Sequence, residues 1–304
     1  MGGSHEHHHS RERDERFVAA ALALIVVFMV GEVVAGLLAG SLALLADAGH
    51  MLSDAGALGL SIWALRLARR PARGAMTFGL KRAEILSALA NATTLLVVAA
   101  AVAVEAVLRL VAPGPVDGVA VVAVAGAGLV VNLAATVLLG RADRSSLNLS
   151  GALAHLVTDV WAFAATLAAG VVIVVAGWRR ADAVASLVTV TLMVRAGWSL
   201  GRAAGRILLE GAPDGVDLDE LRRHLLEVPH VTAVHDLHAW VVTSDMPAVS
   251  AHVVVNDDCF ASGLAPQLLD QLQECLAGHF DVTHSTFQLE PAGHADHEAD
   301  HDHA

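Results

Sequence analysis

Two His and Asp pairs with the same spacing lie in apolar parts of the sequence. His50 precedes Asp54 by four residues, and His155 precedes Asp159 by four. Residues four apart share one face of an α-helix, so each pair would present an imidazole and a carboxylate together. An ionisable side chain inside a bilayer costs about 2.5–3.5 kcal/mol on insertion scales, so each needs a reason to be there. If the two helices face each other, the four side chains form one site with two nitrogen and two oxygen ligands.

This set of ligands favours Zn²⁺ in tetrahedral geometry. The absence of thiolate disfavours Cu⁺ and weakens the case for Cd²⁺, and Mg²⁺ and Ca²⁺ prefer cages made only of oxygen. Two aspartates also neutralise a divalent ion, which an interior of low dielectric requires. The alternative is that each pair is a hydrogen bond within its helix, satisfying a buried polar group. That alternative explains one such pair better than two.

The composition predicts that membrane helices position these residues. The chain has 304 residues, of which 55% are hydrophobic and only 16% charged. About 20 apolar residues span a bilayer, and the run that begins at Phe17 lacks the cleavage site of a signal peptide. Turn signals and charges separate the apolar runs. The sequence therefore predicts six spans, at residues 17–38, 41–67, 84–111, 116–139, 147–175 and 183–200.

Arginine and lysine between the runs predict the orientation. They precede the first span, lie between the second and third and between the fourth and fifth, and follow the sixth. Arg179 and Arg180, between the fifth and sixth spans, are exceptions to this rule. We therefore expect a multi-pass protein of the cell membrane with both termini in the cytoplasm. The residues that set this orientation are Arg11, Arg13, Arg16, Arg66, Arg69, Arg70, Arg73, Lys81, Arg82, Arg141, Arg144, Arg202 and Arg206.

The last third of the chain has the pattern of a small α+β domain. Helical spacing at 216–228 is followed by β-branched segments at 231–243 and 248–256, a helical segment at 264–276 and an alternating segment at 281–290. The order α-β-β-α-β predicts a sandwich whose two helices cover one face of a sheet. Trp240 is expected in its core. The predicted organisation is an N-terminal tail at 1–16, a six-helix transmembrane domain at 17–206, a cytoplasmic domain at 207–291 and a C-terminal tail at 292–304.

Both tails are rich in histidine, which indicates weak metal binding by disordered segments. A solubilising tail or a tag remnant is an equal alternative for the first. The two cysteines, Cys259 and Cys275, have no CxxC partner, so neither a disulfide framework nor a zinc–thiolate site is expected. The net charge of −12 gives no indication of a nucleic-acid partner. The histidines of the tails are His5, His7, His8 and His9, and His294, His297, His301 and His303.

Five segments together resemble the cation diffusion facilitator family. They are SLALLADAGHMLSDA, TFGLKRAEILSALANA, SGALAHLVTDVWAF, VHDLHAW and HSTFQLE, and the resemblance extends over about residues 17–290. It implies a homodimeric six-helix exporter with a ferredoxin-like cytoplasmic domain that binds regulatory metal, and exchange of metal for protons. The transport site carries over to His50, Asp54, His155 and Asp159, and histidine first in both pairs resembles the zinc branch. The resemblance implies a cytoplasmic site made of His235, His252, His284 and Glu290.

The expected function is therefore export of Zn²⁺ from the cytoplasm, with Co²⁺, Cd²⁺ and Fe²⁺ as further candidate cargoes. The expected partners are divalent metal ions, protons, membrane lipid and a second copy of the chain. Some relatives bind metal between helices 2 and 3, but ARRPARGAMTFGLKRAE contains neither His nor Asp, so no site is expected there. A metalloprotease would need an open metal position, typically in HExxH, which the sequence lacks. A passive metal channel and a membrane-anchored metal sensor remain the alternatives to a transporter.

Three of the other polar residues in the predicted spans can be interpreted. Asp47 lies three residues before His50 and is expected to act as an outer partner of the site, as a proton relay, or as a hydrogen-bonding group between helices. Glu32 and Asn91 are interpreted as hydrogen-bonding groups between helices. Gly36 and Gly40 form a pair of small residues that would let the first helix approach a neighbour.

Overall fold

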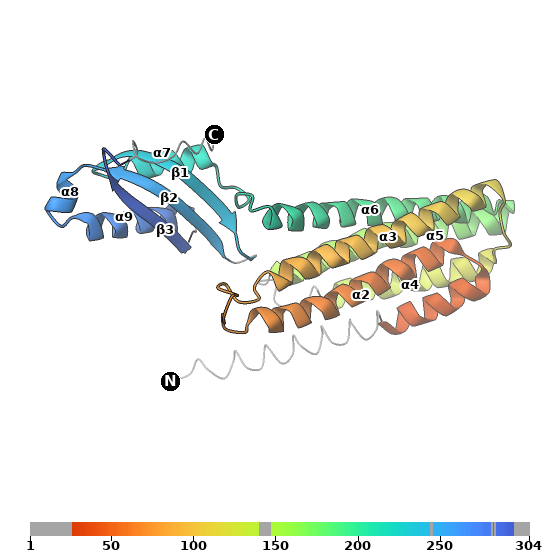
Figure 1. Cartoon of the computed structure of the whole chain (residues 1–304). Coiled ribbons are helices and arrows are strands. Elements are labelled where there is room, and N and C mark those ends of the chain that lie inside the picture. The colour runs from red at the N-terminus through yellow and green to blue at the C-terminus, as the bar shows by residue number, and fades with distance from the viewer. Residues whose placement is uncertain (1–25, 140–146, 244–245, 281, 283, 295–304) are drawn as a thin grey trace. The chain divides into compact units, whose positions relative to one another are not determined.

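The computed structural model describes residues 26–139, 147–243, 246–280, 282 and 284–294 (Figure 1). Contacts divide the chain into two compact units, Met1–Gly59 with Ala90–Leu200, and Leu60–Leu89 with Gly201–Ala304. The first unit is helical and the second contains the three-stranded sheet. The predicted fold class, a helical membrane domain with a small α+β domain, is confirmed.

Helices cover most of the predicted spans. The described part of the first helix is Val26–Ala39, and Gly40 follows it with a φ of +67°. A side chain at Gly40 would place its Cβ 2.7 Å from the carbonyl oxygen of Pro115, so only glycine fits this turn. The remaining helices are α2 (Leu42–Ala68), α3 (Ala83–Val111), α4 (Gly118–Leu139), α5 (Leu147–Ala176) and α6 (Arg180–Leu208).

Three described segments are long and apolar enough to cross a membrane, namely Ala83–Val111, Asp159–Ala176 and Arg180–Leu208, and three further apolar helices are shorter. The helices approach closely through small residues, as expected where lipid leaves no hydrophobic drive for association. A Cβ at Gly170 of α5 would lie 2.9 Å from Val121 and Val122 of α4. Large apolar side chains such as Leu38, Trp161 and Trp198 instead point outward.

The sixth helix is longer than the sequence predicted. Its apolar run ends near Leu200, but α6 continues to Leu208. The additional residues include Arg202, Ala203, Ala204 and Arg206, which are good helix formers although they are not uniformly apolar. The apolar run therefore indicates the thickness of a bilayer, while the helix itself extends beyond it.

The second unit contains a sheet in the order β1-β2-β3. Strand β1 (Val231–Val241) pairs antiparallel with β2 (Pro247–Val255), which pairs parallel with β3 (His284–Pro291). Helices α7 (Leu218–Leu226) and α9 (Ala265–His279) cover one face through a core that includes Leu221, Leu225 and Leu272. The chain also forms α8 (Asp258–Ala261), a single turn that was not predicted. We call the sheet face opposite these helices the open face.

Candidate metal centres

Helices α2 and α5 bring two predicted ligands together inside the first unit. His50 of α2 and Asp159 of α5 have side chains that are 7% and 10% exposed, and Nε2 of His50 lies 3.6 Å from Oδ1 of Asp159. Two ligand atoms of a tetrahedral zinc ion, each about 2.0–2.1 Å from the metal, are about 3.4 Å apart. The two groups therefore stand at nearly the separation that a shared metal ion needs.

The other two predicted ligands lie on the same helices. Asp54 follows His50 by one turn in α2, and His155 precedes Asp159 by one turn in α5. The side chains of Asp54 and His155 fall outside the part of the chain that the structure describes. The four-ligand transport site therefore stays a prediction, supported by the contact of His50 with Asp159.

Acidic residues surround this contact. Asp47 of α2 and Glu32 of the first helix are almost fully buried, at 2% and 1% exposed. Glu32 interacts electrostatically with Asp47 and with Asp159. Three acidic side chains from the first helix, α2 and α5 are therefore close to one another beside His50. The role of Glu32 as a hydrogen-bonding group between helices stays a prediction.

Asn91 also connects two helices. The hydroxyl group of Ser53 in α2 donates to Oδ1 of Asn91 in α3 at 3.4 Å. The interpretation of Asn91 as a hydrogen-bonding group between helices is therefore confirmed. The bond lies one turn beyond His50 and so fixes α2 beside α3 near the predicted ligands.

The second unit gathers three predicted ligands on the open face of its sheet. One carboxylate oxygen of Glu290 lies 3.2 Å from Nε2 of His235, and the other lies 2.9 Å from Nδ1 of His252. One ligand atom from each residue lies within 4.8 Å of the other two. Glu290 is 1% exposed, whereas His235 and His252 are 34% and 24% exposed. The cluster is therefore anchored by a buried anion and reached from water past the imidazoles.

A β-bulge produces this arrangement. His235 pairs with His252 and His238 with Ser250, so β1 has one more residue than β2 between these pairs. Asp236, within the bulge, has a φ of +49°, a conformation that aspartate tolerates better than most residues. Without the bulge, alternation would put His235 on the same face as Leu237, which is in the core. The bulge instead turns His235 toward His252.

The donor set of this cluster suits a divalent transition metal. Two imidazoles and one carboxylate are three of the four ligands of a zinc site and leave a fourth position for water or another residue. Glu290 also accepts a hydrogen bond of 2.7 Å from Nε2 of Gln288, which orients the carboxylate. His235, His252 and Glu290 would hold the metal, and the charge of Glu290 would partly neutralise it.

His284, the fourth predicted ligand, lies elsewhere on the sheet. It pairs with Ala248, four residues before His252 on β2, which corresponds to about 13 Å along a strand. Its ring packs edge-on against Phe78, with the centroids 6.0 Å apart. Within a single chain the structure therefore brings together three of the four residues, and a role for His284 stays a prediction.

Asp236 is a candidate outer partner that the sequence analysis did not single out. One of its carboxylate oxygens lies 2.9 Å from Nε2 of His238, and the other lies 3.8 Å from Nε2 of His252. Its position between two histidines in HDLH was the available signal. The bulge that turns its side chain toward them has no local marker in the sequence.

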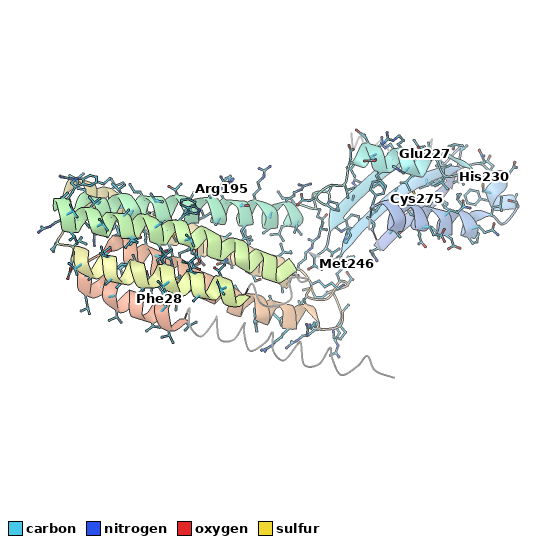
Figure 2. The ribbon with its side chains drawn as sticks, turned by 180° about the vertical axis from the view of Figure 1, so that it is seen from behind. Phe28, Arg195, Glu227, His230, Met246 and Cys275 are labelled. Carbon is cyan, nitrogen blue, oxygen red and sulfur yellow. The ribbon has the colours of Figure 1, made fainter. Side chains whose placement is uncertain are left out.

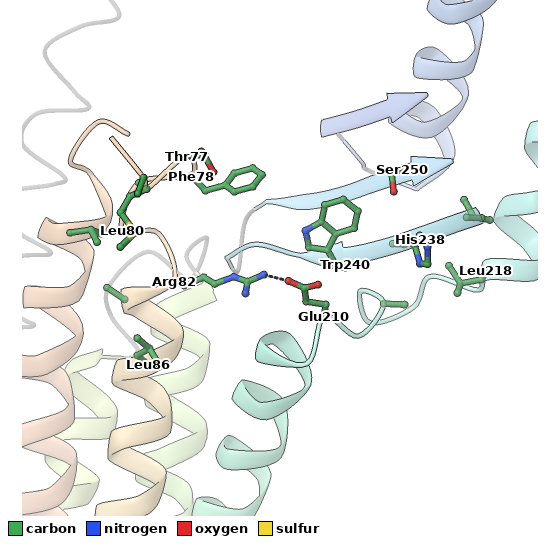
Figure 3. Close-up of a pocket in the computed structure, with 17 residues that line it drawn as sticks. Thr77, Phe78, Leu80, Arg82, Leu86, Glu210, Leu218, His238, Trp240 and Ser250 are labelled. Atoms are coloured by element: carbon green, nitrogen blue, oxygen red, sulfur yellow. Dashed lines mark hydrogen bonds and ion pairs between the residues drawn. The ribbon is translucent and has the colours of Figure 1, made fainter. Parts of the chain in front are cut away.

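The prediction that Trp240 lies in the core is wrong. Trp240 is half-buried on the open face and lines a cavity of about 950 Å³, together with Phe78, Leu218 and His238 (Figure 3). At its edge Arg82 donates to Glu210 at 2.8 Å. Leu237 and Ala239 occupy the core, so alternation directs Trp240 to the other side. The three clustered ligands are not among the residues that line this cavity.

The cysteines are separate from this cluster. Cys259 is buried in the core. Burial, and then the carboxylate of Glu227, raise the pKa of the Cys275 thiol above its ordinary value, so it stays protonated at neutral pH (Figure 2). Of the histidines in the tails, only His294 is among the described residues, and it is exposed.

A bundle of apolar helices with a buried imidazole and carboxylate, followed by a small domain with a second ligand cluster, defines a membrane protein that handles metal cations. Residues 18–209 match the family model of the cation efflux transmembrane domain, and residues 213–292 match that of the cation efflux protein cytoplasmic domain. The chain belongs to the cation diffusion facilitator family, in the branch that includes zinc and other metal transporters.

The similarity to known relatives extends over nearly the whole chain. The metal cation efflux system protein CzcD of Cupriavidus metallidurans is 39% identical, covering 96% of this chain and 91% of its own. The zinc transporter ZitB of Escherichia coli is 36% identical, covering 95% and 93%. A cadmium, cobalt and zinc/H(+)-K(+) antiporter of Bacillus velezensis is 34% identical, again covering 95% and 93%. These relatives are transporters and not enzymes, so this chain is a membrane transporter for metal cation efflux.

Proposed function

We propose that the chain exports Zn²⁺ from the cytoplasm in exchange for protons, through a site made of His50, Asp54, His155 and Asp159. The observation that carries the proposal is the contact of 3.6 Å between His50 and Asp159, which come from α2 and α5. Asp54 lies four residues after His50, and His155 lies four residues before Asp159, so each shares a helix face with one of these residues and would supply one of the other two ligands. Relatives named as zinc transporter and as cadmium, cobalt and zinc antiporter support Zn²⁺, with Co²⁺, Cd²⁺ and Fe²⁺ as further candidates.

Exchange for protons follows from the chemistry of the ligands. Imidazole binds metal only when it is neutral, and its unperturbed pKa of about 6.5 places protonation near physiological pH. Metal loading must therefore release protons, and protons on the more acidic side of the membrane compete the metal off. Glu32 and Asp47 lie beside the site and are positioned to carry one of these protons. The name of the antiporter among the relatives is consistent with this exchange.

The proposed arrangement in the membrane has six spans with both termini in the cytoplasm, where the arginines and lysines of the short loops gather. The His-rich tails would then collect zinc on the side from which it leaves. The His235, His252 and Glu290 cluster would hold a regulatory metal ion in the cytoplasmic domain. The match of residues 213–292 to a dimerisation domain supports a homodimer.

Zinc flux in proteoliposomes, with and without an imposed pH gradient, tests the proposal. We expect the gradient to accelerate flux and a pH change to accompany metal entry. His50→Ala and Asp159→Ala should abolish flux in folded protein. Thr94→Val is a matched control, because Thr94 is exposed and its hydroxyl donates to the carbonyl of Ala90 in its own helix. Wild-type flux in either ligand variant would remove the site assignment, and flux indifferent to the gradient would favour a passive channel.

A further inference from the structure

The first turn of α2 is capped by a side chain from another helix. Asp182, in the first turn of α6, is 1% exposed. Its carboxylate accepts hydrogen bonds from the Ser41 hydroxyl at 2.5 Å, from the amide of Leu42 at 2.7 Å and from the amide of Ala43 at 3.4 Å. The first amides of a helix have no partner within that helix, and in α2 two of them are satisfied from about 140 residues away.

Ser41 completes this cap. While its hydroxyl donates to Asp182, its oxygen accepts from the amide of Leu44 at 3.2 Å. The negative charge of Asp182 also lies at the positive end of the α2 dipole, which favours it. The start of α2 therefore depends on α6 both for hydrogen bonds and for its electrostatic balance.

Arg109 of α3 connects a third helix to the same point. Its Nη1 donates to the carbonyl oxygen of Gly40 at 2.6 Å and lies 3.9 Å from the carboxylate of Asp182. Its Nε donates to Glu105 at 2.9 Å, which holds the guanidinium in place. The entry into α2 is therefore joined to α3 and to α6, beside packed alanines that include Ala43 and Ala185.

These bonds are difficult to break during a conformational cycle. Asp182 and Ser41 are buried, so water is not at hand to replace a lost partner. If α2 separated from α6 at this end, the carboxylate of Asp182 and the amides of Leu42 and Ala43 would all lose these hydrogen bonds at the same time. His50 lies eight residues after Leu42, about 12 Å along the helix axis. The hydrogen bonds of Asp182 to Ser41, Leu42 and Ala43, which we call the joint between α2 and α6, can thus stay formed while the segment around His50 moves.

We propose that Asp182 is a positioning residue for metal transport: it fixes the start of α2 against α6, and the segment that carries His50 and Asp54 moves about this joint. The inference rests on the proposed function in one respect, that α2 carries ligands of the transported ion. Asp182 itself does not touch the metal in this scheme. Its loss should lower the rate of turnover without a matching loss of apparent affinity.

Asp182→Asn and Asp182→Ala test the role. We expect kcat for zinc flux in proteoliposomes to fall about tenfold in Asp182→Asn, which corresponds to about 1.4 kcal/mol in the barrier of the rate-limiting step, and to fall further in Asp182→Ala. KM should change much less. Asp117→Asn is the matched control, because Asp117 is exposed and caps α4, which carries no proposed ligand, by accepting from the amides of Val119 and Ala120. Because asparagine caps a helix about as well as aspartate, Asp117→Asn should change thermal stability little and leave kcat unchanged.

A cross-link gives a test that keeps Asp182 intact. In a chain with Cys259→Ser and Cys275→Ser, Ala43→Cys and Ala185→Cys, which belong to one buried cluster, would be oxidised to a disulfide by molecular iodine, a small apolar oxidant, with the extent of linkage measured by mass. We expect the linked protein to transport zinc at the rate of the unlinked protein. A block of transport by this link would show that the joint opens and would overturn the proposal.

Parallel measurement of His50→Ala separates the two proposals. If His50→Ala retains flux, the transport site is wrong, whatever the result for Asp182. If His50→Ala abolishes flux while Asp182→Asn retains wild-type kcat, the proposed site stands and the positioning role of Asp182 is wrong. Equal loss of kcat in Asp117→Asn and Asp182→Asn would reduce Asp182 to a general stabilising residue.

Discussion

The substitution Glu290→Gln tests the cytoplasmic cluster most directly, because it keeps the shape of the side chain and removes its charge. Glu290 is 1% exposed and contacts His235 at 3.2 Å and His252 at 2.9 Å. A neutral amide oxygen is a weaker metal ligand than a carboxylate, and the amide nitrogen would face an imidazole. We therefore expect a folded protein whose tight metal site is weakened.

The magnitude follows from the place of Glu290 in the cluster. Even the loss of an outer hydrogen-bonding partner lowers metal affinity about 10–100-fold, and Glu290 contacts both histidines directly. We therefore expect the upper end of this range, about a hundredfold increase in Kd, which corresponds to about 2.7 kcal/mol. Glu227→Gln, in an exposed residue of the same domain, should leave Kd unchanged.

Competition for Zn²⁺ against a chromogenic chelator measures this Kd. The assay would use full-length protein in detergent that carries His50→Ala, which removes the proposed membrane site. The tight binding that remains would then belong to the cytoplasmic cluster, because the sites in the tails bind metal only weakly. A Kd within about threefold of the parent, with an unchanged melting curve, would show that Glu290 is not a ligand. A loss of only about 1.4 kcal/mol in binding free energy already raises Kd about tenfold. His284→Ala in the same assay distinguishes a centre of three ligands in one chain, where Kd stays constant, from one that His284 completes.

Three further predictions concern selectivity, the C-terminal tail and the thiol. His50→Asp should broaden transport toward Cd²⁺ or Mn²⁺, because a flexible carboxylate relaxes the tetrahedral preference; an unchanged ion panel at retained activity would oppose this. Removal of the residues after Pro291 should modestly lower apparent zinc affinity in transport assays, because the tail only raises local metal concentration, whereas complete loss of flux would show a structural role. Iodoacetamide should label Cys275 slowly at neutral pH and faster as pH rises toward the raised pKa of the thiol. Glu227→Gln should accelerate labelling, and rapid labelling at pH 7 would contradict the burial argument.

Local spacing was sufficient to predict that His50 and Asp159 lie together but not how the start of α2 is held. The i,i+4 pairs place His50 and Asp159 on inward stripes of two helices, and the structure brings these two residues together. The role of Asp182 had no such signal. Its partners, Ser41 and Leu42, are about 140 residues away, and one aspartate near the start of an apolar run resembles an ordinary first-turn acidic residue.

The sheet shows where alternation stops being informative. The order of helices and strands followed from periodicity, and the extra turn α8 was too short to be detected by it. Strict alternation would place His235 with Leu237 in the core. The bulge at Asp236 reverses that assignment, so the contact between His235 and His252 depends on a backbone irregularity that residue types alone did not indicate.

The two centres use similar donors in different surroundings, and this difference fits different tasks. His50 and Asp159 are enclosed by helices, so a metal ion can reach or leave them only when the helices separate on one side. His235 and His252 are partly exposed above the buried carboxylate of Glu290, so a metal ion can bind there from water without such a movement. Under the proposed function, occupancy of the second centre would follow the metal concentration in the cytoplasm, while occupancy of the first would follow the transport cycle. In that proposal protons would compete with the metal ion for imidazole, and only the enclosed centre would convert this competition into release on one side of the membrane.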